Sequence, residues 1–327
     1  MKRILFFALP LIILSCQNSE KKDGGKTTDL ENTGMAKEAP IKIHLDKDVP
    51  IKSYFKWMDS IVEEHNAKHN YAIDEYIIVH NNSWIIDTLA HTDYYYLQEK
   101  GIYSEDPQAL LALTKSQVVL IPDSIQTQKL RENLSNTHLE LNIPEYRLRI
   151  IQNDQELYKF PVRVGKTGSK YMAMAKRKVD MRTMPGIGEI IRVNKDPVYM
   201  NPVDNKKYEK TNRDDGKRTG LPAIPWLEPA INGRSIGQLI HPTTNLATLE
   251  KTASNGCIGL RESDAWITYY YAPMGTKVVI KYELEGKNEQ GETLQYEDIY
   301  PGFDKIEMKD LPRDSIIKNI EYLNPGL

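Results

Sequence analysis

The second half of the chain alternates apolar and polar residues in short runs, and this alternation constrains the fold more than any other feature. Leu139, Leu141 and Ile143 alternate with polar neighbours, and residues 147–150 repeat the pattern. Because successive side chains of a strand point to opposite faces, such runs predict strands with one buried and one wet face. Helical spacing returns only in one short segment, so we expect a mainly β domain with short helices over residues 138–284.

Turn-forming residues divide this region into short strands. Asn153 and Asp154 separate the run at 147–150 from a further apolar run at 157–164, which predicts an antiparallel meander. Beyond the meander, glycines and prolines recur at short intervals, at Gly165, Gly168, Pro185, Gly186 and Gly188. Residues 285–327 are rich in Glu, Lys and Pro, and we expect them to form a surface extension with one short helix.

The first half of the chain mixes helical and strand-like patterns. Apolar residues recur every three or four positions over 51–69, which predicts an amphipathic helix, and residues 124–137 predict a polar linking helix. Between them lie a strand-like run, two helical runs and a second strand-like run, at 76–79, 84–97, 107–113 and 118–121. We therefore expect a small α+β domain over residues 41–135, ahead of the β domain.

The order β-α-α-β over residues 76–122 resembles a diverged LysM module, a family that grips the glycan chains of peptidoglycan. The resemblance depends on element order, on the apolar helix at 84–90 and on the closing residues 120–122. A small α+β packing module without a ligand accounts for the same pattern, and both interpretations stay open.

Two histidines of the first expected helix are spaced like metal ligands. His65 and His69 lie four residues apart, which would bring both rings to one face of a helix. No third ligand lies nearby, and His65 is not followed by the Glu of metalloproteases. We expect a solvated helix face here, and neither a metal nor a cofactor.

The N-terminus has the pattern of a bacterial secretion signal. A basic start precedes an apolar run at 4–14, which is shorter than the roughly 20 residues that a membrane-spanning helix needs. Residues 13–16 resemble a lipobox, at which bacterial lipoproteins are cleaved before a Cys that then carries the lipid. We expect a signal peptide over 1–15, lipid attachment at Cys16 and a flexible tether over 16–40. This predicts a membrane-anchored protein of the bacterial cell envelope facing the periplasm; an ordinary signal peptide with an incidental Cys is the alternative.

The net charge and the cysteine content restrict the classes of function that the chain can have. The chain has 43 Lys and Arg against 45 Asp and Glu, a formal net charge of −2, which argues against a nucleic-acid partner. It has 2 cysteines, so lipidation of Cys16 would leave Cys257 as the free thiol of an exported protein. Such a thiol is either buried and inert or a nucleophile that the chemistry requires.

A candidate nucleophile and base lie close together in the sequence. Cys257 follows His241 by sixteen residues, and an imidazole that accepts the thiol proton makes cysteine an effective nucleophile. Asn255 and Gly256 directly before the cysteine indicate a tight turn. Backbone N–H groups of such a turn could hold the oxyanion of the attacked carbonyl.

This stretch resembles the L,D-transpeptidase family with the YkuD-type catalytic domain, whose signature is a His followed at this spacing by Ser-His-Gly-Cys. Ser254, Gly256 and Cys257 match that signature, and the segments 164–168 and 183–189 resemble the family's Val-Gly turn and Thr-Pro-x-Gly segment. The resemblance covers residues 138–284 and implies a YkuD-like β-sandwich.

Two positions depart from the family pattern. Asn255 stands where the family usually has a second His, and Gly259 where it usually has Arg. Asn can donate a hydrogen bond but cannot titrate. Arg261 would point to the same side as position 259 in an extended strand. We expect Ser254 and Arg261 to contact the substrate.

The resemblance implies a mechanism on peptidoglycan stem peptides. The Cys257 thiolate attacks the carbonyl between the third residue of a tetrapeptide stem and its terminal D-Ala, and His241 acts as base and then as acid. The Pro242 carbonyl orients the imidazole, and the amides of Gly256 and Cys257 hold the oxyanion. An amine of a neighbouring stem resolves the thioester, which gives a 3→3 cross-link.

Three rival functions remain open at this level. The acceptor could be water, which would make the protein an L,D-carboxypeptidase, or it could be a protein amine. A lipid-anchored wall-binding protein with an unreactive Cys257 is the non-enzymatic alternative. Sortases place the His much farther ahead of the Cys, and papain-like peptidases place the Cys first, so neither order fits this chain.

Overall fold

The computed structural model describes residues 40–303 except residues 174, 202 and 289. All of these residues belong to one compact unit, Glu38–Leu327. The expected signal peptide, nearly all of the expected tether and the helix expected near the C-terminus lie outside the described residues. In the part of the chain that the structure describes, no helix combines the length and apolar character needed to cross a bilayer.

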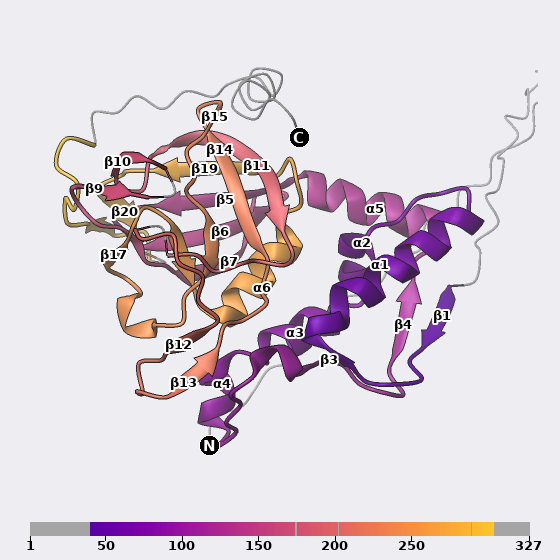
Figure 1. The fold of residues 1–327 in the computed structure, drawn as a ribbon. Coiled ribbons are helices and arrows are strands. Elements are labelled where there is room, and N and C mark those ends of the chain that lie inside the picture. The colour runs from indigo at the N-terminus through magenta and orange to yellow at the C-terminus, as the bar shows by residue number, and fades with distance from the viewer. Residues whose placement is uncertain (1–39, 174, 202, 289, 304–327) are drawn as a thin grey trace, which may run out of the picture. The chain divides into compact units, whose positions relative to one another are not determined.

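A nine-stranded sheet dominates the second half of the chain (Figure 1). Its strand order is β18-β16-β14-β11-β19-β5-β6-β7, with β15 paired to β14. The strands are β5 (Thr137–Asn142), β6 (Arg147–Gln152), β7 (Gln155–Pro161), β11 (Gly186–Asn194), β14 (Trp226–Ile231), β15 (Arg234–Ser235), β16 (Ile240–Pro242), β18 (Ile258–Leu260) and β19 (Lys277–Lys281). Neighbours are antiparallel except β5 with β19 and β16 with β18. The expected mainly β fold with short helices is confirmed.

The alternation seen in the sequence matches the two faces of this sheet. Along β5, Leu139 and Leu141 are fully buried, and Leu148 and Ile150 of β6 pair with them in register. Asn153 and Asp154 both have positive φ, 50° and 62°, the combination that a two-residue hairpin turn requires. The expected meander of β5, β6 and β7 is therefore present.

Shorter strand pairs surround the sheet. They are β8 (Val164–Gly165) with β17 (Thr252–Ser254), β9 (Ser169–Met172) with β10 (Arg177–Asp180), β12 (Lys210–Asn212) with β13 (Arg218–Gly220), and β20 (Glu285–Lys287) with β21 (Thr293–Gln295). A single-turn 3-10 helix, η2 (Leu246–Thr248), follows β16.

Helices form most of the first half of the chain. They are α1 (Ile51–Lys68), α2 (Glu75–Asn81), α3 (Trp84–Ala90), α4 (Tyr94–Glu99) and α5 (Ser124–Ser135), with the 3-10 helix η1 (Pro107–Ala109). Two antiparallel strand pairs complete it: β1 (Ile41–His44) with β4 (Val118–Ile121), and β2 (Val49–Pro50) with β3 (Leu111–Leu113). The helices expected at 51–69 and 124–137 are confirmed, and the expected strand at 118–121 is β4.

The strand expected at 76–79 is wrong, because these residues lie within the helix α2. The side chain of Asp74 caps this helix by accepting a hydrogen bond from the Ile77 amide at 2.9 Å. Residues 107–113 also differ from the expected helix, since they form η1 and β3. The β-α-α-β order on which the LysM resemblance depended is therefore absent.

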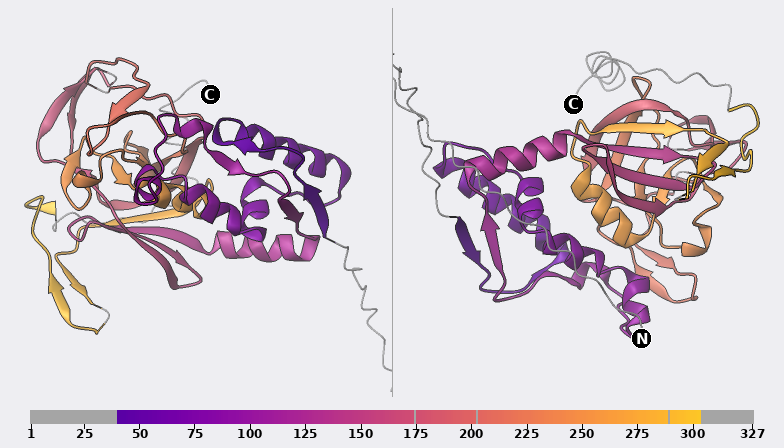
Figure 2. Two further views of the ribbon diagram at one scale, coloured as in Figure 1. Left: turned by 90° about the horizontal axis from the view of Figure 1, so that it is seen from below. Right: turned by 180° about the vertical axis from the view of Figure 1, so that it is seen from behind.

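Helix α6 (Glu262–Tyr271) lies between the sheet and the helices of the first half (Figures 1 and 2). Trp266, Tyr269 and Tyr270 are fully buried there. The Tyr270 hydroxyl lies 2.7 Å from that of Tyr54 on α1, and the Tyr269 hydroxyl donates to the carboxylate of Glu75. One continuous apolar core joins the two halves of the chain through this helix.

The segment after residue 284 is more than a surface extension. Tyr300 is fully buried and Phe303 is 5% exposed, and their rings pack against each other and against Tyr282. The Tyr300 hydroxyl donates to the Gly165 carbonyl. The end of the described chain therefore supports the turn after β8.

Asp264 in the first turn of α6 generates a prediction about stability. Burial raises the pKa of its carboxyl to about 7, and one carboxylate oxygen has no hydrogen-bond partner. Between about pH 4 and pH 7, Asp264 is ionised in the unfolded chain but still protonated in the folded protein. The unfolded chain therefore binds fewer protons, and the free energy of unfolding falls as pH rises. Asp264→Asn should remove this slope, which is at most about 1.4 kcal/mol per pH unit.

Urea denaturation of the wild type and of Asp264→Asn at pH 5 and pH 7 measures the effect. The variant should gain stability over the wild type as pH rises. The exposed Asp196→Asn is the matched control and should leave the slope of the wild type unchanged. Parallel pH dependences of Asp264→Asn and wild type would contradict the prediction.

Candidate functional site

Cys257 lies at the end of a tight turn directly before β18. Gly256 has a φ of +114°, a conformation that glycine adopts at little cost and other residues avoid. The Ser254 hydroxyl donates to the Cys257 carbonyl at 2.6 Å and accepts a hydrogen bond from the Gly256 amide at 3.1 Å. Ser254, which is 6% exposed, thus closes the turn that presents the half-buried thiol.

The hydroxyl of Thr183 connects this turn to two other segments. It accepts a hydrogen bond from the Gly165 amide at 2.9 Å and donates to the Gly256 carbonyl at 2.9 Å. The three segments singled out in the sequence, 164–168, 183–189 and 254–257, therefore meet at one fully buried side chain. The sequence pattern marked the segment of Thr183 but did not reveal this role.

Gln238 supports the same turn from the other side. Its amide nitrogen donates to the Arg182 carbonyl at 2.8 Å, and its oxygen accepts from the Met184 amide at 3.0 Å. A Cβ added at Gly256 would lie 2.9 Å from this amide nitrogen, so the glycine also serves close packing. Sequence reasoning missed Gln238 because its partners lie more than fifty residues away.

The imidazole of His241 is held in one tautomer by the backbone. Its Nδ1 lies 2.8 Å from the Pro242 carbonyl oxygen, which can only accept, so Nδ1 carries the proton. Nε2 is then left as the basic nitrogen. The Trp226 ring packs on the imidazole with ring centroids 5.6 Å apart. The hydrogen bond between His241 Nδ1 and the Pro242 carbonyl is the contact that the resemblance implied for Pro242.

Parallel pairing of β16 and β18 brings the histidine and cysteine segments together. Ile240 lies opposite Ile258 and His241 opposite Gly259. Just before these pairs, the Leu239 amide donates to the Cys257 Sγ at 3.4 Å. The two candidate catalytic side chains therefore come from neighbouring strand ends, sixteen residues apart in sequence.

Both groups of this dyad are neutral at pH 7. Burial and, to a smaller extent, the charge of Arg163 lower the pKa of His241 to about 4, against the opposing effect of the hydrogen bond to Pro242. Burial raises the pKa of the Cys257 thiol, against the opposing effects of the Leu239 amide and Arg163. The resting site therefore holds a neutral thiol and a neutral imidazole on neighbouring segments, which suits general-base activation during attack better than a preformed ion pair.

The expected oxyanion hole needs a correction. The Gly256 amide already donates to Ser254, so it is not free in this structure. The Cys257 amide has no hydrogen-bond partner among residues 40–303 that the structure describes, and it remains available to an oxyanion. The half-buried Asn255 lies within the turn. The hydrogen bonds that close the turn are made by Ser254 and not by Asn255.

The arginine next to the site is Arg163 and not the expected Arg261. Arg261 is exposed and begins α6, whereas Arg163 beside β8 pairs with Gly259 through two backbone hydrogen bonds of 2.9 and 3.0 Å. The charge of Arg163 acts on both Cys257 and His241. Sequence reasoning missed Arg163 because its partner Gly259 lies far along the chain and is brought to it by backbone pairing.

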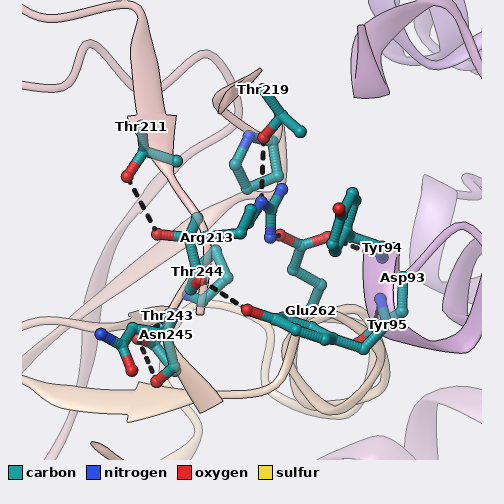
Figure 3. Close-up of polar contacts among 12 residues, drawn as sticks. Asp93, Tyr94, Tyr95, Thr211, Arg213, Thr219, Thr243, Thr244, Asn245 and Glu262 are labelled. Atoms are coloured by element: carbon teal, nitrogen blue, oxygen red, sulfur yellow. Dashed lines mark hydrogen bonds and ion pairs between the residues drawn. The ribbon is translucent and has the colours of Figure 1, made fainter. Parts of the chain in front are cut away.

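A buried ion pair lies beside the loop that follows His241 (Figure 3). Arg213, from the β12–β13 hairpin, pairs with Glu262 of α6, and neither side chain is more than 3% exposed. Burial raises the pKa of Glu262 to about 6 although Arg213 lowers it. The Tyr95 hydroxyl of α4 donates to the Thr244 carbonyl at 3.1 Å, so the first half of the chain also contacts this loop.

Within the described ranges, no group of three or more His, Cys, Asp or Glu side chains could hold a metal ion. His65 and His69 stack with ring centroids 4.3 Å apart, and His65 is buried, so the expected solvated face is wrong for His65.

The neutral dyad predicts how Cys257 reacts with an alkylating agent. The rate constant with iodoacetamide should rise with pH and reach its midpoint above about 8.5, the ordinary thiol value, because only the thiolate reacts. Mass spectrometry of Cys257 in the mature protein between pH 5 and pH 10 measures it, with glutathione as reference. A plateau already reached below pH 7 would instead indicate a preformed thiolate–imidazolium pair.

Residues 136–280 match the family model of the YkuD L,D-transpeptidase catalytic domain. A search of curated proteins found no match. Solved structures that resemble the chain include L,D-transpeptidases from Mycobacterium smegmatis (14% identity, TM-score 0.30), Xylanimonas cellulosilytica (14%, 0.32) and Mycobacterium tuberculosis (16%, 0.29).

The alignments cover different shares of the chains. They span 45%, 75% and 45% of this chain and 58%, 99% and 57% of the respective structures, so the chain covers little more than half of the two mycobacterial proteins. The assignment rests on the family model, whose range agrees with the expected 138–284 to within a few residues. The matched residues make up less than half of the chain, and over 136–280 they are similar to an L,D-transpeptidase catalytic domain of the YkuD type.

Proposed function

We propose that this protein is a peptidoglycan L,D-transpeptidase that forms 3→3 cross-links through a thioester on Cys257. One observation carries the proposal: Cys257 and a His241 with a free basic nitrogen lie on neighbouring strand ends of a YkuD-type domain. The substrates would be peptidoglycan stem peptides, and no step calls for a metal or a cofactor.

In the first half-reaction the Cys257 sulfur forms a bond to the carbonyl carbon between the third stem residue and D-Ala. His241 Nε2 takes the thiol proton as the attack proceeds, which fits a dyad that is neutral at rest. The Cys257 amide donates to the oxyanion. When the carbon–nitrogen bond breaks, the imidazolium returns the proton to the departing amine, and D-Ala leaves.

In the second half-reaction an amine of a neighbouring stem attacks the thioester. His241 accepts a proton from that amine, and the thiol is released with the proton that the imidazolium holds. The acceptor distinguishes a transpeptidase from an L,D-carboxypeptidase, in which water attacks. Both share the same first half-reaction on Cys257.

The dyad generates the central prediction. Cys257→Ala should abolish release of D-Ala from a disaccharide tetrapeptide, and His241→Gln should lower its rate about 10²–10⁴-fold, the usual contribution of general acid–base catalysis. His138→Gln changes a half-buried histidine of β5 and should keep the wild-type rate. Mass spectrometry of the products measures both D-Ala release and acceptor identity.

The products separate the rival functions. A dimer lighter than two tetrapeptides by one D-Ala supports the transpeptidase, and a tripeptide alone supports the carboxypeptidase. Wild-type turnover by Cys257→Ala would exclude the proposed nucleophile. A protein that binds peptidoglycan but releases no D-Ala would support the wall-binding alternative.

Anchoring of the enzyme to a membrane is proposed from the sequence of the N-terminus. Lipidation at Cys16 would supply several acyl chains, enough for stable anchoring where a single chain is marginal. A tether of about 24 residues spans on average about 25–30 Å, which would let the catalytic domain sample wall close to the lipid surface. The proposed location is the periplasmic side of the bacterial cell envelope.

Cys16→Ser tests this anchoring. The variant should remain an uncleaved precursor without lipid, because cleavage at a lipobox follows lipid transfer. Membrane fractionation and mass determination of the N-terminus provide the measurement, and Ser15→Ala is the neighbouring control. Normal processing of Cys16→Ser to a soluble form would show that the cysteine is incidental.

A further inference from the structure

Arg163 is held across the strand that carries the nucleophile. Its amide donates to the Gly259 carbonyl at 2.9 Å, and the Gly259 amide donates to its carbonyl at 3.0 Å. A Cβ at position 259 would lie 2.4 Å from Arg163 Nε and 2.7 Å from its Cγ. The arginine side chain therefore fills the space that any side chain at position 259 would need, two residues after Cys257.

The Arg163 guanidinium is a half-buried cation with few hydrogen-bond partners. Among the residues that the structure describes, its side chain forms one hydrogen bond, a long one of 3.5 Å from Nη1 to the Thr248 hydroxyl, and its Nε is buried without a partner. No carboxylate of the described residues forms an ion pair with it or acts on its charge. Arg163 is half-buried, and a cation that is partly desolvated without a counter-ion is costly, so its free donors are available to bind an anion.

The groups around the guanidinium belong to the catalytic centre. The charges that act on Arg163 are those of Cys257 and Tyr208, and Arg163 in turn acts on His241. The one acid that also acts on Cys257 is Glu228, which is already engaged by Arg192 and by the Ser235 hydroxyl. The unpaired donors of Arg163 therefore lie beside the reacting atoms and have no protein anion to satisfy them.

We propose that Arg163 is a substrate-positioning residue that binds the free C-terminal carboxylate of the acyl donor. The inference rests on the proposed function and adds the group by which the donor is selected. In a stem that ends in D-Ala, the carboxylate carbon is three bonds from the carbonyl carbon that Cys257 attacks. A planar guanidinium with five donors can bind both oxygens of that carboxylate, whereas a thiolate would satisfy only one donor.

The proposal predicts selectivity for donors that end in a free acid. The wild type should process a tetrapeptide stem with a free carboxylate with a kcat/KM at least about 30-fold higher than the same stem with a C-terminal amide, as expected for a buried charge pair. Arg163→Met should lose most of this preference, because its kcat/KM should fall much more on the acid than on the amide. Arg163→Lys keeps the charge without the planar fork and should retain part of the preference.

The experiment measures release of D-Ala or D-alaninamide from both donors by the mature wild type, Arg163→Met, Arg163→Lys and the exposed control Arg177→Met. Calorimetric binding of both donors to Cys257→Ala, with and without Arg163→Met, gives a readout that does not require turnover. Arg177→Met should keep the wild-type preference.

Each outcome decides one question. Collapse of the acid preference in Arg163→Met, through a loss on the acid that exceeds any change on the amide, supports the inference. Equal losses on both donors would overturn it, because Arg163 would then act on the thiol or on the fold. A wild type that releases product without preferring the acid would also overturn it while leaving the proposed function intact. Acid-selective, Arg163-dependent binding without any turnover would instead contradict the proposed function and support the inference.

Discussion

A single hydroxyl, that of Thr183, joins the three segments from which the cysteine turn is built. It accepts from the amide of Gly165 and donates to the carbonyl of Gly256, both at 2.9 Å. Neither glycine can be enlarged in place: a Cβ on Gly165 would lie 1.9 Å from the Met181 carbonyl oxygen. Because a buried polar group without its partner is costly, the position of the thiol depends on a contact between residues more than seventy positions apart.

The first half of the chain is part of the same folding unit as the catalytic domain. Asp93 accepts a hydrogen bond from the Ser263 amide at 2.9 Å, and the Tyr94 ring packs on the guanidinium of Arg213, whose carbon lies 4.5 Å from the ring centroid. Arg213 in turn pairs with Glu262, beside the loop after His241 (Figure 3). Loss of Arg213 or Glu262 would leave the other charge buried and uncompensated. Because Asp93 and Tyr94 contact this region, the first half of the chain stabilises the end of the sheet that carries the site.

Sequence reasoning succeeded where the signal is local. The strands over 137–161 follow from the alternation of apolar and polar residues. The catalytic role of His241 and Cys257 was inferred from one short stretch and stays a prediction. It failed at 76–79, because Ile77, Ile78 and Val79 are all fully buried and a helix that is apolar on every side shows no helical period. It could not find Thr183, Gln238 or Arg163 as site residues, because their partners are set by strand pairing across the sheet rather than by neighbours in the chain.

The charges of the site suggest why an unpaired arginine beside the dyad is useful. Burial and, to a smaller extent, the positive charge of Arg163 lower the pKa of His241 and keep the imidazole a weak base while the site is empty. A donor carboxylate bound to Arg163 would neutralise that charge, which would raise the pKa of His241 and would also remove the lowering effect of Arg163 on the pKa of the Cys257 thiol. Burial raises the thiol pKa in the empty site, which limits idle reactions of the cysteine. Binding of the donor carboxylate at Arg163 would therefore shift the proton affinities of both the base and the thiol.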